Sequence, residues 1–171
     1  RTNEGSINLG LQAERGLNYE LNFRGATASR KLSFDLALFY FQLDDAITTF
    51  TDRQGVVLFR NAGETSQKGL ELSSKMDWIS AESGMITSLS STLAYTYHNF
   101  QFENYIDDGD DFSGVALPGT APHVVNIQTD LELRGGVYLN LTYHYSDPIP
   151  LNDANTFFSK AYSLINLRTG F

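Results

Sequence analysis

The chain has 171 residues and no cysteine, which excludes a disulfide framework and any cysteine-based metal site or nucleophile. Its formal net charge is −8, from 20 acidic and 12 basic side chains, so nucleic acid is not an expected partner, because phosphate binding needs a basic surface. No apolar run approaches the roughly 18 residues that a membrane-spanning helix requires.

Apolar and polar residues alternate with a period of two along most of the chain, which predicts strands and no helix. In the first such segment, for example, Leu17, Tyr19 and Leu21 are separated by polar side chains. In chain order the alternating segments are 17–23, 32–40, 70–78, 85–97, 125–133, 137–145 and a less regular 162–171. We therefore expect an all-β chain of seven strands.

The connections between these strands alternate strictly between short and long. The short ones are 25–31, 79–84 and 134–136, and the long ones are about 44–59, 99–123 and 146–161. Bacterial outer-membrane barrels show this alternation, because short periplasmic turns oppose long external loops.

Aromatic residues gather at the strand ends, where amphipathic rings are most stable at a membrane–water interface. With the long loops outside, Phe23, Phe34 and Trp78 lie at the inner ends of their strands. Seven tyrosines lie at the outer ends, and all except Tyr162 fall clearly on the apolar face: Tyr19, Tyr40, Tyr95, Tyr97, Tyr143, Tyr145 and Tyr162. We expect an antiparallel transmembrane β-barrel in which Leu36, Leu93 and Leu141 face lipid. The alternation alone would also fit a soluble β-sandwich.

Six sequence blocks occur in an order and spacing that resemble the C-terminal third of TonB-dependent outer-membrane receptors, in the ferric-siderophore and ferric-citrate branch. They are LNYELNFRG (17–25), KLSFDLALFY (31–40), FRNAGETSQKGLEL (59–72), LAYTY (93–97), LPGTAPH (117–123) and YSLINLRTGF (162–171). Together they cover most of the chain.

The resemblance implies about seven strands of a 22-stranded barrel in the outer membrane of a Gram-negative bacterium. Residues 1–171 would form a single barrel segment, the C-terminal part of a receptor whose plug domain and last strands are absent. Its function would be uptake of a ferric-siderophore-like chelate, driven by the TonB system through the missing plug. The alternative is a small eight-stranded structural or adhesive barrel, with an extra strand around Ile7, Leu9 and Leu11.

Eight residues in the external loops or at the barrel mouth are candidate ligand contacts: His98, Phe100, Tyr105, Asp107, Asp108, Asp110, His144 and Phe157. Each also has a structural interpretation, namely ordinary lumen polarity for the histidines, loop packing for the aromatic rings and a solvated loop for the acids. The histidines lack ligand spacing, so no metal site is expected from them. The acidic loop from Asp107 to Asp111 lacks the downstream glutamate of a calcium loop, and a weak divalent-cation site there is kept only as an alternative to a solvated loop.

The stretch from Asn61 to Glu71 is the most family-like part of the sequence. Its glycines suggest a barrel bend, and Glu71 is expected to face the lumen, where it could contact the plug of a full receptor. No catalytic set of side chains and no phosphate loop can be assembled from the sequence. We therefore expect neither an enzyme nor a cofactor.

Overall fold

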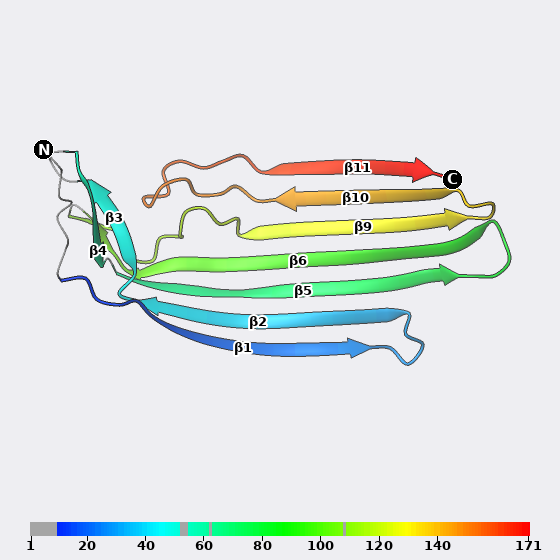
Figure 1. The fold of residues 1–171 in the computed structure, drawn as a ribbon, viewed down its shortest axis with the longest axis horizontal. Coiled ribbons are helices and arrows are strands. Elements are labelled where there is room, and N and C mark those ends of the chain that lie inside the picture. Colours follow the sequence, from blue (N-terminus) through cyan, green and yellow to red (C-terminus); the bar gives the residue numbers. More distant parts are fainter. Residues whose placement is uncertain (1–9, 52–54, 62, 108) are drawn as a thin grey trace, which may run out of the picture.

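The structure is a computed structural model that describes residues 10–51, 55–61, 63–107 and 109–171 (Figure 1). All regular structure in these ranges is β. Within them, no helix is long and apolar enough to cross a membrane.

The seven predicted strands form one antiparallel sheet whose strands neighbour one another in chain order, which confirms the prediction. They are β1 (Arg15–Ala26), β2 (Leu32–Asp44), β5 (Glu64–Ser80), β6 (Ile86–Asn104), β9 (His123–Leu133), β10 (Tyr138–Ser146) and β11 (Tyr162–Gly170). Two small hairpins lie inside the segments expected as loops: β3 (Ile47–Thr51) with β4 (Val57–Asn61), and β7 (Ile106–Asp107) with β8 (Asp110–Asp111).

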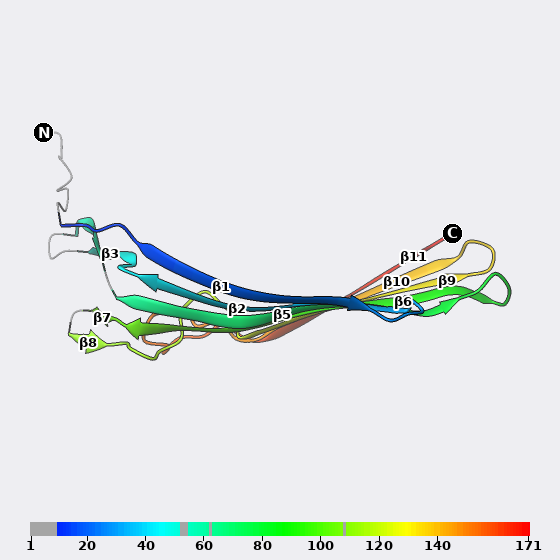
Figure 2. The same cartoon turned by 90° about the horizontal axis from the view of Figure 1, so that it is seen from below.

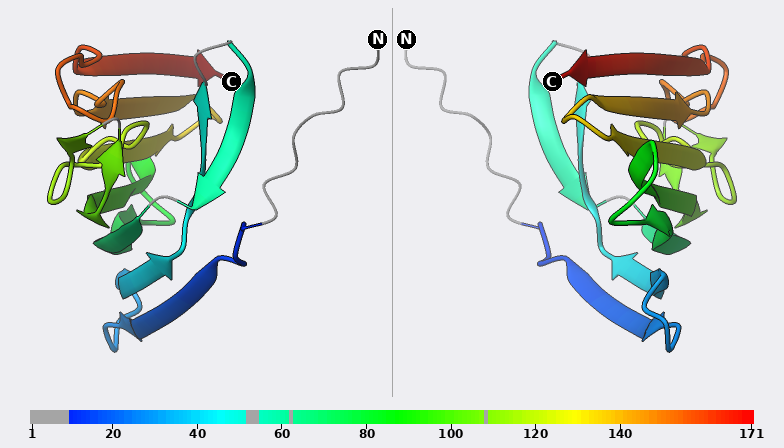
Figure 3. Two further views of the ribbon diagram at one scale, coloured as in Figure 1. Left: turned by 90° about the vertical axis from the view of Figure 1, so that its left-hand side faces the viewer. Right: turned by 90° about the vertical axis from the view of Figure 1, so that its right-hand side faces the viewer.

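The sheet is a single curved layer, seen edge-on in Figure 2 and along the strands in Figure 3. The short turns and the C-terminus lie at one end, and the long loops lie at the other (Figure 1). The β3–β4 hairpin stands on the concave side. Strands β1 and β11 lie at the two edges, so the sheet is open. Of the extra strand considered at the N-terminus, Ile7 and Leu9 lie outside the described residues, and Leu11 belongs to no strand.

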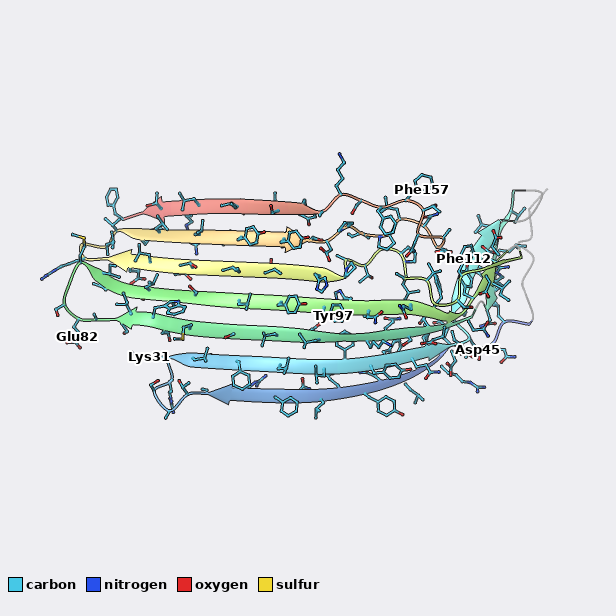
Figure 4. All side chains as sticks on the ribbon, turned by 180° about the vertical axis from the view of Figure 1, so that it is seen from behind. Lys31, Asp45, Glu82, Tyr97, Phe112 and Phe157 are labelled. Atoms are coloured by element: carbon cyan, nitrogen blue, oxygen red, sulfur yellow. The ribbon has the colours of Figure 1, made fainter. Side chains whose placement is uncertain are left out.

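Strand register places the apolar side chains on one continuous face. Leu38 pairs with Leu70, and Leu70 with Tyr97, while Ile127 pairs with Leu93 on one side and Tyr143 on the other. No second layer covers this face in the described part of the chain, and Leu141 and Ile165 are 39% and 71% exposed. Figure 4 views the convex side of the sheet, with Tyr97 labelled on β6. An uncovered apolar face suits hydrocarbon and not water.

Two hydroxyl groups on this apolar face, those of Ser91 and Thr129, have hydrogen-bond partners within the sheet. The Ser91 and Thr129 hydroxyls lie 3.1 Å apart, and the Trp78 indole Nε1–H donates to Ser91 Oγ at 3.1 Å. Such pairing is needed in a bilayer, because a polar group in hydrocarbon has no water to bind.

The outer tyrosine belt forms on the apolar face as expected, with Tyr19 and Tyr40 stacked at 6.4 Å between ring centroids. Tyr162 differs. It pairs with Ser146, and its hydroxyl lies 3.1 Å from His144 Nε2, so it belongs to the polar face. The polar face lies on the concave side, which is the lumen side in a closed barrel.

Candidate functional site

The two faces of the sheet exchange character beyond the tyrosine belt. Near the short turns, the lumen face of β2 and β6 carries small and polar residues. Nearer the long loops, that face carries four phenylalanines: Phe39, Phe41, Phe100 and Phe102. The outward face becomes polar over the same stretch. The strands therefore rise above the membrane, where water lies outside and an apolar surface can form inside the mouth.

Three lumen-facing rings from β2 and β6, the strands on either side of β5, are in contact. Phe39 and Phe100 meet edge to face, with centroids 6.1 Å apart and ring planes at 73°. His98 lies 4.8 Å from Phe100. We call Phe39, His98 and Phe100 the aromatic wall. Offset and edge contacts of this kind are the favoured aromatic geometries, so the wall is a fixed surface.

The orientation of His98 is set by the backbone. Its Nδ1 lies 3.0 Å from the carbonyl oxygen of Ala121, which can only accept a hydrogen bond. Nδ1 therefore carries the hydrogen, and in the neutral ring Nε2 is left as an acceptor. The aromatic wall thus combines two apolar rings with one hydrogen-bonding nitrogen.

Between the tyrosine belt and the long-loop end of β6, the segment 114–122 pairs with β6 in place of β9. Phe102 N donates to Val115 O at 3.0 Å, Leu117 N donates to Phe100 O at 2.9 Å, and His98 N donates to Pro122 O at 2.8 Å. A pocket of about 240 Å³ lies between β6 and this segment. Its lining includes His98 and Phe100 from lumen-facing positions, and also Tyr97, Asn99 and His123 from outward-facing positions. The LPGTAPH block thus supports the candidate site.

The three long loops meet at Tyr105, which is 3% exposed. Its ring packs 4.5 Å from Phe102, and its hydroxyl donates to Asp153 Oδ2 at 3.3 Å. Arg60, from the first loop, forms an ion pair with Asp107 of the second. Burial, together with the nearby carboxylates of Asp153 and Asp107, raises the pKa of Tyr105, so its hydroxyl stays protonated and remains a donor.

Replacement of Tyr105 by phenylalanine keeps the ring and removes the hydroxyl, which donates to Asp153 and also has a side-chain hydrogen bond with Arg60. We expect the contact between the second and third loops to weaken by about 1 kcal/mol, with faster backbone hydrogen exchange in residues 105–117 and 147–158. Hydrogen exchange followed by mass spectrometry measures this, with Tyr162→Phe as a control outside the cluster. Unchanged exchange in both loops would show that the Asp153 contact does not join them.

The structure brings some predicted ligand residues together and separates others. His98 and Phe100 are in contact, whereas Tyr105 and Asp107 have partners within the loops. Phe157 is 67% exposed in the third loop.

Of the remaining three candidates, the structure describes two, and these lie apart from each other. His144 lies deeper in the lumen, opposite Asn126, and its Nδ1 is 2.7 Å from Asn126 Oδ1. Asp110 is exposed at the β7–β8 tip, and Asp108 lies outside the described residues. Among the described residues, no three His, Cys, Asp or Glu side chains are arranged to hold a metal ion.

Sequence reasoning did not identify Phe39 as part of this site, although a signal was present. Phe39 occupies a position of polar parity in the second alternating segment, in line with Ser33 and Asp35. A large aromatic residue at such a position has no reason to face a watery lumen. This break in the alternation marks where the lumen face becomes apolar.

Glu71 faces the lumen and is exposed, as predicted from its position in the alternation. It shares a broad polar hollow with Glu20, Arg24 and Asp35, and the last two form an ion pair between β1 and β2. The proposed contact of Glu71 with a plug remains a prediction.

Comparisons with known proteins agree with this architecture. A family model described as TonB dependent receptor-like, beta-barrel, matches residues 1–171. The ferric yersiniabactin uptake receptor FyuA from Yersinia pestis is similar, with a TM-score of 0.67 and 20% identity over 92% of this chain and 22% of that one.

Two further solved structures show the same likeness. The siderophore receptor PiuA from Acinetobacter baumannii gives a TM-score of 0.65 and 16% identity, over 89% of this chain and 21% of that one. The ferric-catecholate import receptor Fiu from E. coli K12 gives a TM-score of 0.66 and 15% identity, over 93% of this chain and 21% of that one. At these identities the likeness shows the fold. The chain spans about a fifth of the length of each structure.

Proposed function

The chain belongs to the TonB-dependent receptor-like β-barrel family, and from this premise we propose that it forms part of the wall of a receptor that imports a ferric-siderophore-like chelate. Members of this family are transporters of the Gram-negative outer membrane and are not enzymes. The similar structures described above are iron or siderophore receptors, which supports the ligand class.

We further propose that residues 1–171 are a C-terminal segment of the barrel of a longer receptor. The open sheet supports this, because β1 and β11 each pair on one side only in the described part of the chain. The plug domain and the remaining strands would come from the rest of the receptor, and TonB would act through that plug. Within the ligand class, the six sequence blocks also make ferric citrate a candidate.

The observation that carries the proposed function is the aromatic wall. It lies on the lumen face at the end of the long loops, where an incoming ligand first meets the barrel. A wall of two apolar rings and one hydrogen-bonding nitrogen suits the flat organic surface of a metal chelate. Phe157 and Asp110, exposed in the neighbouring loops, would make the first contacts.

The function is tested in cells that lack the parent gene and grow under iron limitation. Expression of the intact receptor should restore growth and uptake of a ferric chelate, and an uncoupler of the proton gradient should abolish this uptake. Chelates bearing catecholate, hydroxamate or citrate groups would be compared in turn. If none is taken up in an energy-dependent manner, the proposed function is wrong.

Within that receptor, Phe100→Ala removes the central ring of the aromatic wall. We expect chelate affinity to fall by roughly tenfold, because an aromatic contact contributes about 0.5–1.5 kcal/mol beyond the apolar area that it buries. Equilibrium binding to purified receptor measures the change. Phe23→Ala, on the opposite face near the short turns, is the matched control and should leave affinity unchanged. Equal losses in both variants would locate the ligand elsewhere.

A further inference from the structure

Two carboxylates border the aromatic wall on the lumen face. Strand register places Glu20, Phe39, Gly69 and His98 side by side in one row across β1, β2, β5 and β6. Residues directly opposite each other on one face have Cβ atoms about 5 Å apart, so the Glu20 carboxylate is within reach of a ligand held against Phe39. Glu71 lies two residues from Gly69 on the same face of β5, about 7 Å nearer the short turns. The rings therefore have one negative charge beside them and another below them.

A hollow of about 750 Å³ opens next to the wall, and its lining includes both Glu20 and Glu71. Most of the residues that line it hold lumen-facing positions, among them Ala37 and Thr96. Because these side chains are small, a ligand that touches the wall has room to extend toward both carboxylates. Glu20 accepts a hydrogen bond from Asn22 Nδ2 at 2.7 Å, and neither carboxylate takes part in an ion pair within the described ranges.

The lumen face of the seven described strands has three cations, and each of them has a partner. Arg24 and Lys75 each form an ion pair with an aspartate, and Arg168 lies 5.6 Å from the centroid of a tyrosine ring. The same face has six carboxylates: Glu20, Asp35, Glu71, Asp77, Asp130 and Glu132. A concave surface on which one sign of charge dominates concentrates ions of the opposite sign. This part of the lumen wall therefore attracts cations and repels anions.

Given the proposed function, on which this inference rests, we propose that the imported chelate carries a positively charged ammonium group, which binds against Phe39 and Phe100 with Glu20 as its counter-ion. The face of an aromatic ring attracts a cation. The Nε2 atom of His98, which is an acceptor in the neutral ring, can take one of the ammonium hydrogens. The ring faces, the carboxylates and Nε2 thus all complement a cationic donor.

The charge of a ferric chelate depends on its iron-binding groups. Three singly charged hydroxamates neutralise Fe³⁺, and a primary amine is protonated at neutral pH, so a trihydroxamate that bears one amine is a cation. Catecholate and citrate chelates of ferric iron are anions, which the carboxylates of the lumen face would repel. Among the chelates considered above, an amine-bearing hydroxamate is therefore the best match to this wall.

The test measures equilibrium binding of three ferric trihydroxamates to the purified intact receptor. The chelates differ only at one end, which bears a free amine, an acetylated amine or a succinylated amine, so their net charges are positive, zero and negative. We expect the free-amine chelate to bind roughly tenfold more tightly than the acetylated one, and the succinylated chelate to bind most weakly. Because salt screens exposed charges, these differences should shrink as the ionic strength rises.

Variants of the receptor assign the effect to Glu20. We expect Glu20→Gln to bind the free-amine chelate roughly threefold more weakly and the acetylated chelate normally, whereas Glu20→Asp should retain the preference for the amine. Glu132→Gln is the matched control, because it removes the same charge from the lumen face of β9 near the short turns. It should bind all three chelates like the unmodified receptor.

Equal affinities of the unmodified receptor for the free-amine and acetylated chelates would overturn the proposal, and so would equal affinities of Glu20→Gln and Glu132→Gln for the free-amine chelate. The first comparison needs no variant, so it remains decisive even if a variant fails to fold. Energy-dependent uptake of ferric citrate or a ferric catecholate in preference to all three chelates would also overturn it, but would leave the proposed transport function intact. That function is contradicted only when no chelate is taken up.

Discussion

Leu141→Arg is expected to destabilise the folded barrel by about 2–4 kcal/mol, because it places a charge on the lipid face near the middle of the bilayer. The depth follows from register: Leu141 pairs with Leu167 and with Thr129, and Thr129 pairs with Ser91. This row lies between the tyrosines of the outer belt and Trp78 near the short turns. The Leu141 side chain is 39% exposed, and no layer of the described residues covers it.

The matched control is Thr142→Arg, the next residue of the same strand. Thr142 faces the lumen and pairs with the neutral side chains Gln128 and Asn166. An arginine there would remain in water, so we expect a change below about 1 kcal/mol. Denaturant unfolding of the intact receptor in lipid vesicles compares the two variants. If both lose the same stability, lipid does not cover the Leu141 face, and the assignment of the two faces is wrong.

The large sheet could be predicted from the sequence because its physics is local. Most strands carry a clear alternation over the part that the apolar face covers, and the short turns mark where one strand ends and the next begins. A period of two also fixes which side chains share a face, so His98 and His144 were placed correctly on the polar side. The outer-membrane interpretation depended on the positions of the tyrosines near the outer strand ends. The strand register of the structure aligns these tyrosines in one belt.

The loop architecture could not be predicted in the same way. Strands β7 and β8 have only two residues each, too few for any periodic signal. Their placement depends on contacts between distant segments, such as Arg60 with Asp107 and Tyr105 with Asp153. For the same reason Tyr105 resembled an exposed ligand contact in the sequence but is buried where three loops meet.

The extension of β6 to Asn104 also escaped prediction, because its alternation reverses sense beyond Tyr97. Beyond Tyr97 the apolar positions move from the outward face to the lumen face. The alternation of the outward face therefore stops there, which predicts that the strand ends. The reversal is a property of the environment: the strand leaves hydrocarbon while its inner face enters the loop-covered mouth. The candidate site lies at this transition, which explains why only its β6 residues were identified.

Gly69→Ala is expected to destabilise the barrel by about 1–3 kcal/mol and to disturb the aromatic wall. A Cβ atom at Gly69 would lie 2.2 Å from the Tyr97 carbonyl oxygen and 2.6 Å from the Phe39 ring. The carbonyl belongs to the β6 backbone and cannot move without breaking the β5–β6 pairing. Phe39, which covers this glycine, would also lose its position against Phe100.

Gly16→Ala provides the comparison that separates these two causes. A Cβ there would meet the Phe41 ring at 2.8 Å, with the nearest backbone atom 4.0 Å away. Phe41 can rotate away at a cost of about 0.5–1.5 kcal/mol, and the added Cβ restricts the unfolded chain, which offsets about 0.4–1 kcal/mol of it. We therefore expect near-normal stability for Gly16→Ala. Unfolding in lipid vesicles and chelate binding should both be impaired in Gly69→Ala alone. Equal behaviour of the two variants would mean that the ring contact, and not the close approach of β5 to β6, requires the glycine.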